Sequence, residues 1–233
     1  MSSPEQTSLS AANSAIPFGY DFRESRLKRC RDFIEALPSK GRFLDVGCTQ
    51  GGLLEWARSR GWDAYGTDIN PANIEQCRTR GLNVEWCDLA AQALPWPDGH
   101  FDFVFAWEII EHLVDTDRFI EDVHRVLKPK GAAIITTPNL ASFGNRLRLL
   151  FGRYPEWMDY SLKEGPGHVR YYTPRILKRQ LESHRFRVVK QAGNFVPIVP
   201  QFLLNDMQCP PLATLGRVFP SLCQGLIVLL EKR

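Results

Sequence analysis

Two glutamates and two histidines have the residue types and the spacing to do chemistry. Glu108, Glu111 and His112 lie close together in the stretch Trp107–His112. If this stretch is helical, positions i, i+3 and i+4 share one face, and the three side chains would converge. Such a set can bind a divalent ion, or the imidazole alone can act as a general base. His168 follows in a glycine-rich run. The ordinary alternative is that a glutamate caps a helix and a histidine lines a pocket.

The elements that would position this cluster begin with a strand, a turn and a helix. Phe43, Leu44 and Val46 form a short apolar run that predicts a buried strand. A glycine-rich turn follows, and then an amphipathic segment that stops at Gly61, which predicts a helix. This order is typical of the nucleotide-binding corner of an open parallel sheet, where the ligand lies beyond the carboxyl end of the strand.

The residues of the turn limit the class of ligand that it can bind. A dinucleotide fingerprint would need glycine at Thr49, and a phosphate loop would need lysine at Leu53. Instead an acid, Asp45, stands two residues before the first glycine. That carboxylate would repel a pyrophosphate, but it can accept hydrogen bonds from a ligand that carries an ammonium group.

The sequence Asp45-Val46-Gly47-Cys48-Thr49-Gln50-Gly51 resembles the first motif of class I S-adenosylmethionine-dependent methyltransferases, which usually have glycine in place of Thr49. The resemblance continues to Asn139. It implies a doubly wound α/β sheet of seven mostly parallel strands, with a cap inserted after strand five. It also implies that the methionine end of the cofactor is held by Asp45, Gly47, Cys48 and Gly51.

Two further strands end in acids. The strand Trp62–Thr67 is followed by Asp68, where a ribose diol would lie in such a sheet, with Ile69 against the adenine. The strand Asn83–Cys87 is followed by Asp88, which the resemblance pairs with the adenine amino group. Leu89 and Trp107 complete the expected cofactor contacts.

The rest of the pattern predicts one domain, residues 20–233, after a disordered tail, residues 1–19, with residues 139–172 as the substrate cap. The first half of Leu140–Tyr160 is expected to be helical. The remaining predicted helices are Asp21–Leu37, Pro71–Arg80, Asp115–Leu127 and Thr173–His184. The remaining predicted strands are Phe103–Ala106, Ala132–Thr137 and the antiparallel pair Phe186–Gln191 and Leu222–Leu230.

Composition limits the class of protein and its partners. The chain has 233 residues, 44% of them hydrophobic and 24% charged, with a net charge of +3, so nothing indicates nucleic acid as a general partner. The segment Asn139–Lys190 is basic, because it contains 11 lysine and arginine residues and only 4 aspartate and glutamate residues.

The six cysteines form no C-x-x-C pair, which favours reduced thiols in the cytoplasm. No apolar run approaches the length of about 20 residues that spans a bilayer. The apolar stretch Phe195–Pro211 could line a pocket, dock a partner or touch lipid.

These observations together predict a methyltransferase that makes an O-methyl product on a small or lipid-linked metabolite. The Glu108, Glu111, His112 and His168 pattern resembles that of ubiquinone-pathway O-methyltransferases and of small-RNA 2′-O-methyltransferases, where it holds magnesium. The alternative, that His112 acts as a general base without a metal, fits the pattern equally well. The alternatives are a metal-dependent methyltransferase acting on RNA, although no RNA-binding module is visible, and a regulatory protein that binds the cofactor without chemistry.

Overall fold

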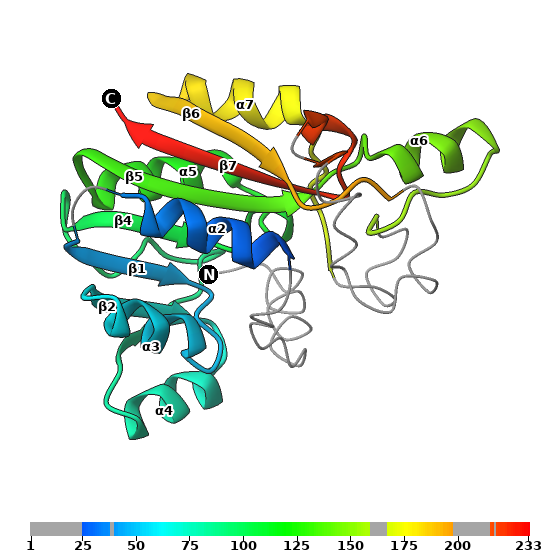
Figure 1. Ribbon diagram of the computed structural model, residues 1–233. Coiled ribbons are helices and arrows are strands. Elements are labelled where there is room, and N and C mark those ends of the chain that lie inside the picture. Colours follow the sequence, from blue (N-terminus) through cyan, green and yellow to red (C-terminus); the bar gives the residue numbers. More distant parts are fainter. Residues whose placement is uncertain (1–24, 38–39, 159–166, 198–214, 217) are drawn as a thin grey trace.

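The computed structural model describes residues 25–37, 40–158, 167–197, 215–216 and 218–233, which form a layered α/β fold (Figure 1). Its described part contains a seven-stranded sheet in the order β3-β2-β1-β4-β5-β7-β6. The strands are β1 Arg42–Val46, β2 Asp63–Asp68, β3 Asn83–Trp86, β4 Phe101–Ala106, β5 Leu127–Pro138, β6 Phe186–Gly193 and β7 Gly225–Lys232. The first five pair in parallel, and β7 lies antiparallel between β5 and β6. The doubly wound sheet and its antiparallel final pair are confirmed.

Helices cover both faces of the sheet. The helices are α2 Ser25–Glu35, α3 Gly52–Ser59, α4 Pro71–Thr79, α5 Thr116–Val126, α6 Phe143–Leu150 and α7 Pro174–Ser183, with short 3-10 turns at η1 Ile110–His112 and η3 Pro220–Leu222. The apolar sides of α2, α3 and α4 pack on one face, and those of α5 and α7 on the other. Successive strands of β1 to β3 step one way along the sheet, while β4 lies on the opposite side of β1. A ligand crevice is expected where the order reverses, between β1 and β4.

The helix starts follow local capping chemistry. The side chain of Asn70 accepts a hydrogen bond from the amide of Ala72 at the start of α4, and Thr173 accepts from Ile176 at the start of α7. Each of these helices has proline as its first residue, where no backbone donor is needed. Both helices begin within one residue of their predicted start.

Several predicted boundaries are wrong. The predicted strand Ala132–Thr137 is too short, because α5 ends at Val126 and β5 begins directly at Leu127. β7 begins at Gly225 rather than Leu222, since the preceding residues form η3. In the predicted cap, α6 confirms the helical first half of Leu140–Tyr160. The predicted tail, the segment 159–166 and most of Phe195–Pro211 lie outside the described residues.

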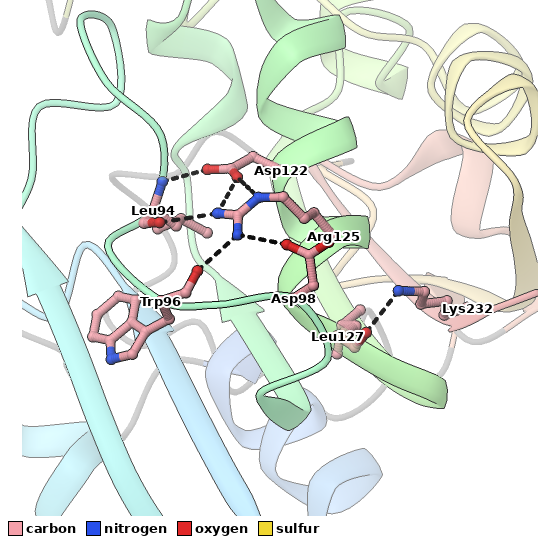
Figure 2. A network of polar contacts seen from close by, with 7 residues as sticks. All are labelled: Leu94, Trp96, Asp98, Asp122, Arg125, Leu127 and Lys232. Carbon is pink, nitrogen blue, oxygen red and sulfur yellow. Dashed lines mark hydrogen bonds and ion pairs between the residues drawn. The ribbon is translucent and has the colours of Figure 1, made fainter.

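The loop before β4 is held by one arginine of α5 (Figure 2). Arg125 donates to the carbonyl oxygens of Leu94 at 2.9 Å and Trp96 at 2.7 Å. Its guanidinium also pairs with Asp122 at 2.6 Å and with the more exposed Asp98 at 3.2 Å. These bonds fix the path of the chain into β4, which the candidate residues Glu108, Glu111 and His112 follow directly.

Candidate active site

The turn after β1 has the backbone shape that its glycines permit. Gly47 and Gly51 have φ angles of 81° and 78°. A Cβ atom on Gly47 would lie 2.5 Å from Cδ1 of Ile109, so a side chain there would displace the isoleucine as well as strain the backbone. Thr49 also adopts a positive φ, 47°, a conformation that costs roughly 1–2 kcal/mol for a residue with a Cβ atom. The turn therefore forms although threonine stands where the expected motif has glycine.

The carboxylate of Asp68, at the end of β2, ties this turn to the start of α4. Its Oδ2 accepts a hydrogen bond from the amide of Thr49 at 2.8 Å. Its Oδ1 accepts from the amide of Asn70 at 2.8 Å and from the side chain of Asn73 at 3.2 Å. A carboxylate offers about four lone-pair positions, so these bonds leave it capacity for a further donor such as a hydroxyl.

The other expected cofactor contacts follow the ends of neighbouring strands. Ile69 follows β2, Asp88 and Leu89 follow β3, and Trp107 follows β4. Because β3, β2, β1 and β4 are parallel neighbours, their carboxyl ends meet along one edge of the sheet. Asp45 and Cys48, on either side of Gly47, are fully buried beneath this edge. The structure thus brings the sequence-predicted residues together on the side where doubly wound sheets bind ligands.

Hydrogen bonds from side chains to backbone groups fix the chain after β2 and after β3. The indole of Trp86 donates to the carbonyl of Ile69 at 2.7 Å. After β3, Oδ1 of Asp88 accepts from the amide of Ala90 at 2.9 Å, and Arg118 donates to the carbonyl of Leu89. The backbone that would lie beside an adenine ring is therefore held from both sides.

Glu108 does not lie on a helix with Glu111 and His112, so the predicted helical spacing is wrong. Its φ is 52°, and the 3-10 turn η1 begins only at Ile110. The carboxylate of Glu108 pairs with Arg26 of α2 at 2.9 Å, and its Oε1 accepts from the hydroxyl of Thr136 at 2.9 Å. The Arg26 guanidinium also lies over the Trp107 ring, 4.6 Å from its centre.

Glu111, His112 and His168 do converge. Each offers a ligand atom, and these atoms lie within 4.8 Å of one another. The two imidazole rings meet edge to face, with their centres 4.8 Å apart. Among the described residues, this is the group of acids, cysteines or histidines with the spacing of a metal site. Glu108 is not part of it.

The loop that carries His168 is bonded directly to η1. The backbone carbonyl of Glu111 accepts from the amides of Val169 at 2.8 Å and Arg170 at 3.0 Å. Nδ1 of His112 lies 3.3 Å from the carbonyl of Gly167. These contacts explain how a histidine far along the chain reaches a residue that follows β4.

Both histidines have their tautomer set by carbonyl oxygens. Nδ1 of His168 lies 2.7 Å from the carbonyl oxygen of Trp157, and Nδ1 of His112 lies 3.3 Å from the carbonyl oxygen of Gly167. A carbonyl can only accept, so each neutral ring carries its proton on Nδ1 and its lone pair on Nε2. Such second contacts are typical of histidines that ligate a metal or accept a proton.

The carboxylate of Glu111 is an unusual buried acid. It is 1% exposed, and neither oxygen makes a well-formed hydrogen bond among the described residues, although the hydroxyl of Thr137 and the backbone amide of Glu111 lie close enough to lower its pKa a little. Burial, with the nearby Glu108 carboxylate as a second cause, raises the pKa of Glu111 well above its ordinary range. An orphaned carboxyl group of this kind is costly unless a cation, or a bound ligand, completes its contacts.

Arg26 and Thr136 are the site residues that the sequence did not single out. Arg26 belongs to the predicted helix Asp21–Leu37, and Figure 1 shows this helix, α2, lying over the sheet. Its position on that helix was the available signal. Thr136 is one of two adjacent threonines that follow the apolar run Ala132–Ile135, and nothing in the sequence distinguishes it.

Comparison with known proteins identifies this arrangement. Residues 22–191 match the family described as a methyltransferase domain. The chain belongs to the class I S-adenosylmethionine-dependent methyltransferases. This methyltransferase is 30% identical to a ubiquinone biosynthesis O-methyltransferase of Sinorhizobium fredii over 182 residues, 75% of this chain and 72% of the relative. It is 35% identical to the Chelativorans protein of the same name over 159 residues, 66% of this chain and 62% of that relative.

Solved structures show the same fold at low identity. A methyltransferase dependent on S-adenosylmethionine from Archaeoglobus fulgidus aligns with a TM-score of 0.61 at 22% identity, covering 88% of this methyltransferase and 92% of that chain. A methyltransferase of Haloferax volcanii, solved with an activator protein, aligns with a TM-score of 0.64 at 16% identity over 99% of each chain. In the part of the methyltransferase that the structure describes, no helix is long and apolar enough to cross a bilayer.

Proposed function

We propose that this methyltransferase transfers the methyl group of S-adenosylmethionine to a hydroxyl oxygen of a small or lipid-linked metabolite. The observation that carries the proposal is the convergence of Glu111, His112 and His168 beside the cofactor edge. A hydroxyl, unlike an amine, must lose a proton or have its charge stabilised before it attacks the methyl carbon. The two relatives named as ubiquinone biosynthesis O-methyltransferases support an oxygen acceptor.

The cofactor would lie along the strand ends. Asp45 and the turn from Gly47 to Gly51, Cys48 included, would hold the methionine end. Asp68 would accept the ribose hydroxyls, and Asp88 the adenine amino group, with Ile69, Leu89 and Trp107 around the ring. The position of these residues at adjoining carboxyl ends supports this assignment.

The chain's own groups can handle the proton of the acceptor. The lone pair on Nε2 of His112 would take the hydroxyl proton while the oxygen displaces the sulfonium, so the products are a methyl ether, S-adenosylhomocysteine and a proton on the ring. His168 would orient the acceptor from the opposite side of the cluster. Glu108, held by Arg26 and Thr136, would keep Trp107 and the chain after β4 in place.

The same cluster fits a divalent cation. Glu111, His112 and His168 would hold it, because the buried carboxyl group makes no well-formed hydrogen bond and the ligand atoms of the three side chains lie within 4.8 Å of one another. When bound, the ion would lower the pKa of a coordinated hydroxyl group. Two imidazoles with one carboxylate suit manganese, iron or zinc better than magnesium, which favours oxygen ligands.

Methyl transfer to a panel of acceptors tests the proposed function. Purified protein is incubated with methyl-deuterated S-adenosylmethionine and hydroxylated aromatic metabolites, their lipid-linked forms, matching amines and an RNA oligonucleotide, and the products are read by mass spectrometry. We expect label on hydroxyl oxygens of the metabolites. Label on amines or RNA alone, or cofactor binding without any product, would contradict the proposal.

The metal part of the proposal has its own test. The active enzyme is treated with a chelator and then supplied with magnesium, manganese, cobalt or zinc. We expect the rate to fall on chelation and to recover best with a transition metal. An unchanged rate after verified metal removal would leave His112 as a metal-free base and reject the metal site.

A further inference from the structure

Two cysteines that are far apart in the chain meet beneath the turn from Gly47 to Gly51. Cys48 belongs to this turn, and Cys77 lies on α4. The sulfur of Cys77 donates to the carbonyl oxygen of Thr49 at 3.4 Å, and the sulfur of Cys48 lies 4.0 Å from the same oxygen. Both side chains are free thiols and are fully buried. The structure thus places two thiols against one carbonyl group of the turn.

Two glycines make room for this pair. A Cβ atom on Gly66 of β2 would lie 2.8 Å from the sulfur of Cys48, and one on Gly51 would lie 3.0 Å from the sulfur of Cys77. Cys48 and Cys77 also belong to the same apolar core cluster, which packs on the sheet. Each sulfur therefore occupies space that is open because a side chain is missing, and this keeps both thiols at the turn.

The two thiols are not chemically equivalent. They share a hydrogen bond, which is the main cause that lowers the pKa of Cys77. The Arg80 guanidinium, which also donates to the carbonyl of Gln50 in the turn, lowers this pKa further, whereas burial acts in the opposite direction. The same hydrogen bond, together with burial, raises the pKa of Cys48. Cys77 is therefore the member that forms a thiolate, as in pairs in which one cysteine attacks an oxidant and the other resolves the product.

We infer that Cys48 and Cys77 form a reversible disulfide when the protein meets a peroxide, and that this bond lowers the affinity of the turn for S-adenosylmethionine. The Cys77 thiolate attacks one oxygen of hydrogen peroxide, the O–O bond breaks, and the released hydroxide takes up the proton that Cys77 had lost. The sulfur of Cys48 then attacks the sulfenic acid at Cys77, the S–O bond breaks, and the hydroxide leaves with the proton of Cys48. Two thiols and one peroxide thus give one disulfide and two waters.

The disulfide changes the shape of the turn. It needs its two sulfur atoms about 2 Å apart, much closer than two thiols that share a hydrogen bond. Closing this distance draws Cys48 toward α4 together with Thr49, whose amide donates to Asp68 and whose carbonyl contacts Cys77. The turn then no longer holds the methionine end of the cofactor in the same position. The effect on affinity rests on the proposed place of that methionine end, whereas formation of the disulfide does not.

Cofactor binding and oxidation then oppose each other. If the disulfide weakens cofactor binding, bound cofactor disfavours the disulfide by the same factor, because the coupling between two sites is reciprocal. Since both thiols are fully buried, peroxide reaches them only when the turn opens locally. A ligand that keeps the turn closed therefore also slows the reaction.

Peptide mapping and titration of the same samples test the inference. The reduced protein is treated with hydrogen peroxide, with or without saturating S-adenosylhomocysteine. Catalase then removes the peroxide, and N-ethylmaleimide blocks the remaining thiols of a denatured portion. Trypsin separates the two cysteines by cleavage after Arg58 and Arg60, so mass spectrometry identifies peptides joined by the disulfide.

We expect a disulfide between Cys48 and Cys77 that forms more slowly with S-adenosylhomocysteine. In the sample oxidised without that ligand, the Kd for S-adenosylmethionine should be at least about tenfold higher than in the reduced protein. Dithiothreitol should restore the original Kd. No such disulfide after peroxide treatment, or an oxidised wild type with the Kd of the reduced protein, would overturn the inference.

Two serine variants separate this pair from cysteine oxidation in general. Cys77→Ser should bind S-adenosylmethionine like the wild type when reduced, and its Kd should not change after peroxide. Cys223→Ser removes a thiol whose pKa is raised by burial to about 11, and it should respond to peroxide like the wild type. An equal loss of affinity in Cys77→Ser and the wild type would also overturn the inference. Failure of the proposed function shows in the reduced protein, as absent methyl transfer to hydroxyl groups, and is therefore distinguishable.

Discussion

The carboxylate of Asp68 holds the turn after β1 against the start of α4, and we propose that it also accepts the ribose hydroxyls. Its three hydrogen bonds come from Thr49, Asn70 and Asn73. An Asp68→Asn variant keeps the shape but replaces one acceptor oxygen by a donor. We expect the Kd for S-adenosylmethionine to rise by at least about tenfold, measured by isothermal titration. Asp63→Asn, at the exposed start of the same strand, should leave the Kd unchanged, and an equal effect of both variants would contradict the assignment.

Single residues also show where sequence reasoning reaches and where it stops. Asp68 could be predicted, because an acid at the end of the second strand has a fixed place in a doubly wound sheet. The backbone conformation at Glu108 could not be predicted. Its φ of 52° is set by bonds to Thr136 and Arg26, residues far away in the chain. A helical spacing rule therefore placed Glu108 in the cluster, whereas tertiary contacts turn it away.

At the scale of elements, two glycines with similar backbone angles make a matched pair. Gly51 precedes α3 with φ 78°, and a Cβ there would lie 2.4 Å from Leu82 and 3.0 Å from Cys77. Gly61 follows the same helix with φ 85° and has no atom within 4 Å of such a Cβ. We expect Gly51→Ala to lower the free energy of unfolding by roughly 2–4 kcal/mol and Gly61→Ala by about 1 kcal/mol.

Urea unfolding of both glycine variants checks this difference. Gly51→Ala should also weaken cofactor binding, because the turn must shift to relieve the contact with Leu82. A loss of stability in Gly61→Ala as large as that in Gly51→Ala would show that backbone strain alone governs both positions.

Elements were predictable where their signals are local. Capping by Asn70 and Thr173 with a following proline needs only neighbouring residues, and both helices begin as expected. The start of β5 was not predictable in this way, because the strand was expected at Ala132 and in the structure already pairs with β4 at Leu127. Pairing with a strand formed by earlier residues is a tertiary effect that a local signal does not contain.

For the molecule as a whole, His124 of α5 makes stability depend on pH. Its ring packs edge to face on Phe186 of β6, is 7% exposed and has no partner for Nε2 among the described residues. Burial, with Lys232 and Arg185 nearby, lowers the pKa of His124 from 6.5 to about 4. The unfolded chain therefore binds a proton in the window between these values that the folded chain excludes, and stability falls as the pH falls through it.

The expected loss from His124 is about 2 kcal/mol between pH 7.5 and pH 5. Urea unfolding at both pH values measures it. His124→Gln removes the titrating group, so its stability should change less with pH by that amount. An identical pH dependence in the variant and the wild type would show that the folded protein protonates His124 without cost.

The whole-molecule arrangement was the most predictable part, because strand order in a doubly wound sheet follows from the chain order of the strands. The position of His168 was less predictable. It depends on the amides of Val169 and Arg170 bonding to the carbonyl of Glu111, which no spacing in the sequence expresses.

The measurement that tests the account most directly is kcat for methyl transfer to a hydroxyl acceptor by the His112→Gln and Glu111→Gln variants, with the Kd for S-adenosylmethionine measured on the same samples. The account predicts a fall in kcat of about 100-fold or more for each, with cofactor affinity unchanged. His100→Gln, on the loop before β4, should match the wild type. A kcat within a few fold of the wild type in both cluster variants would contradict it.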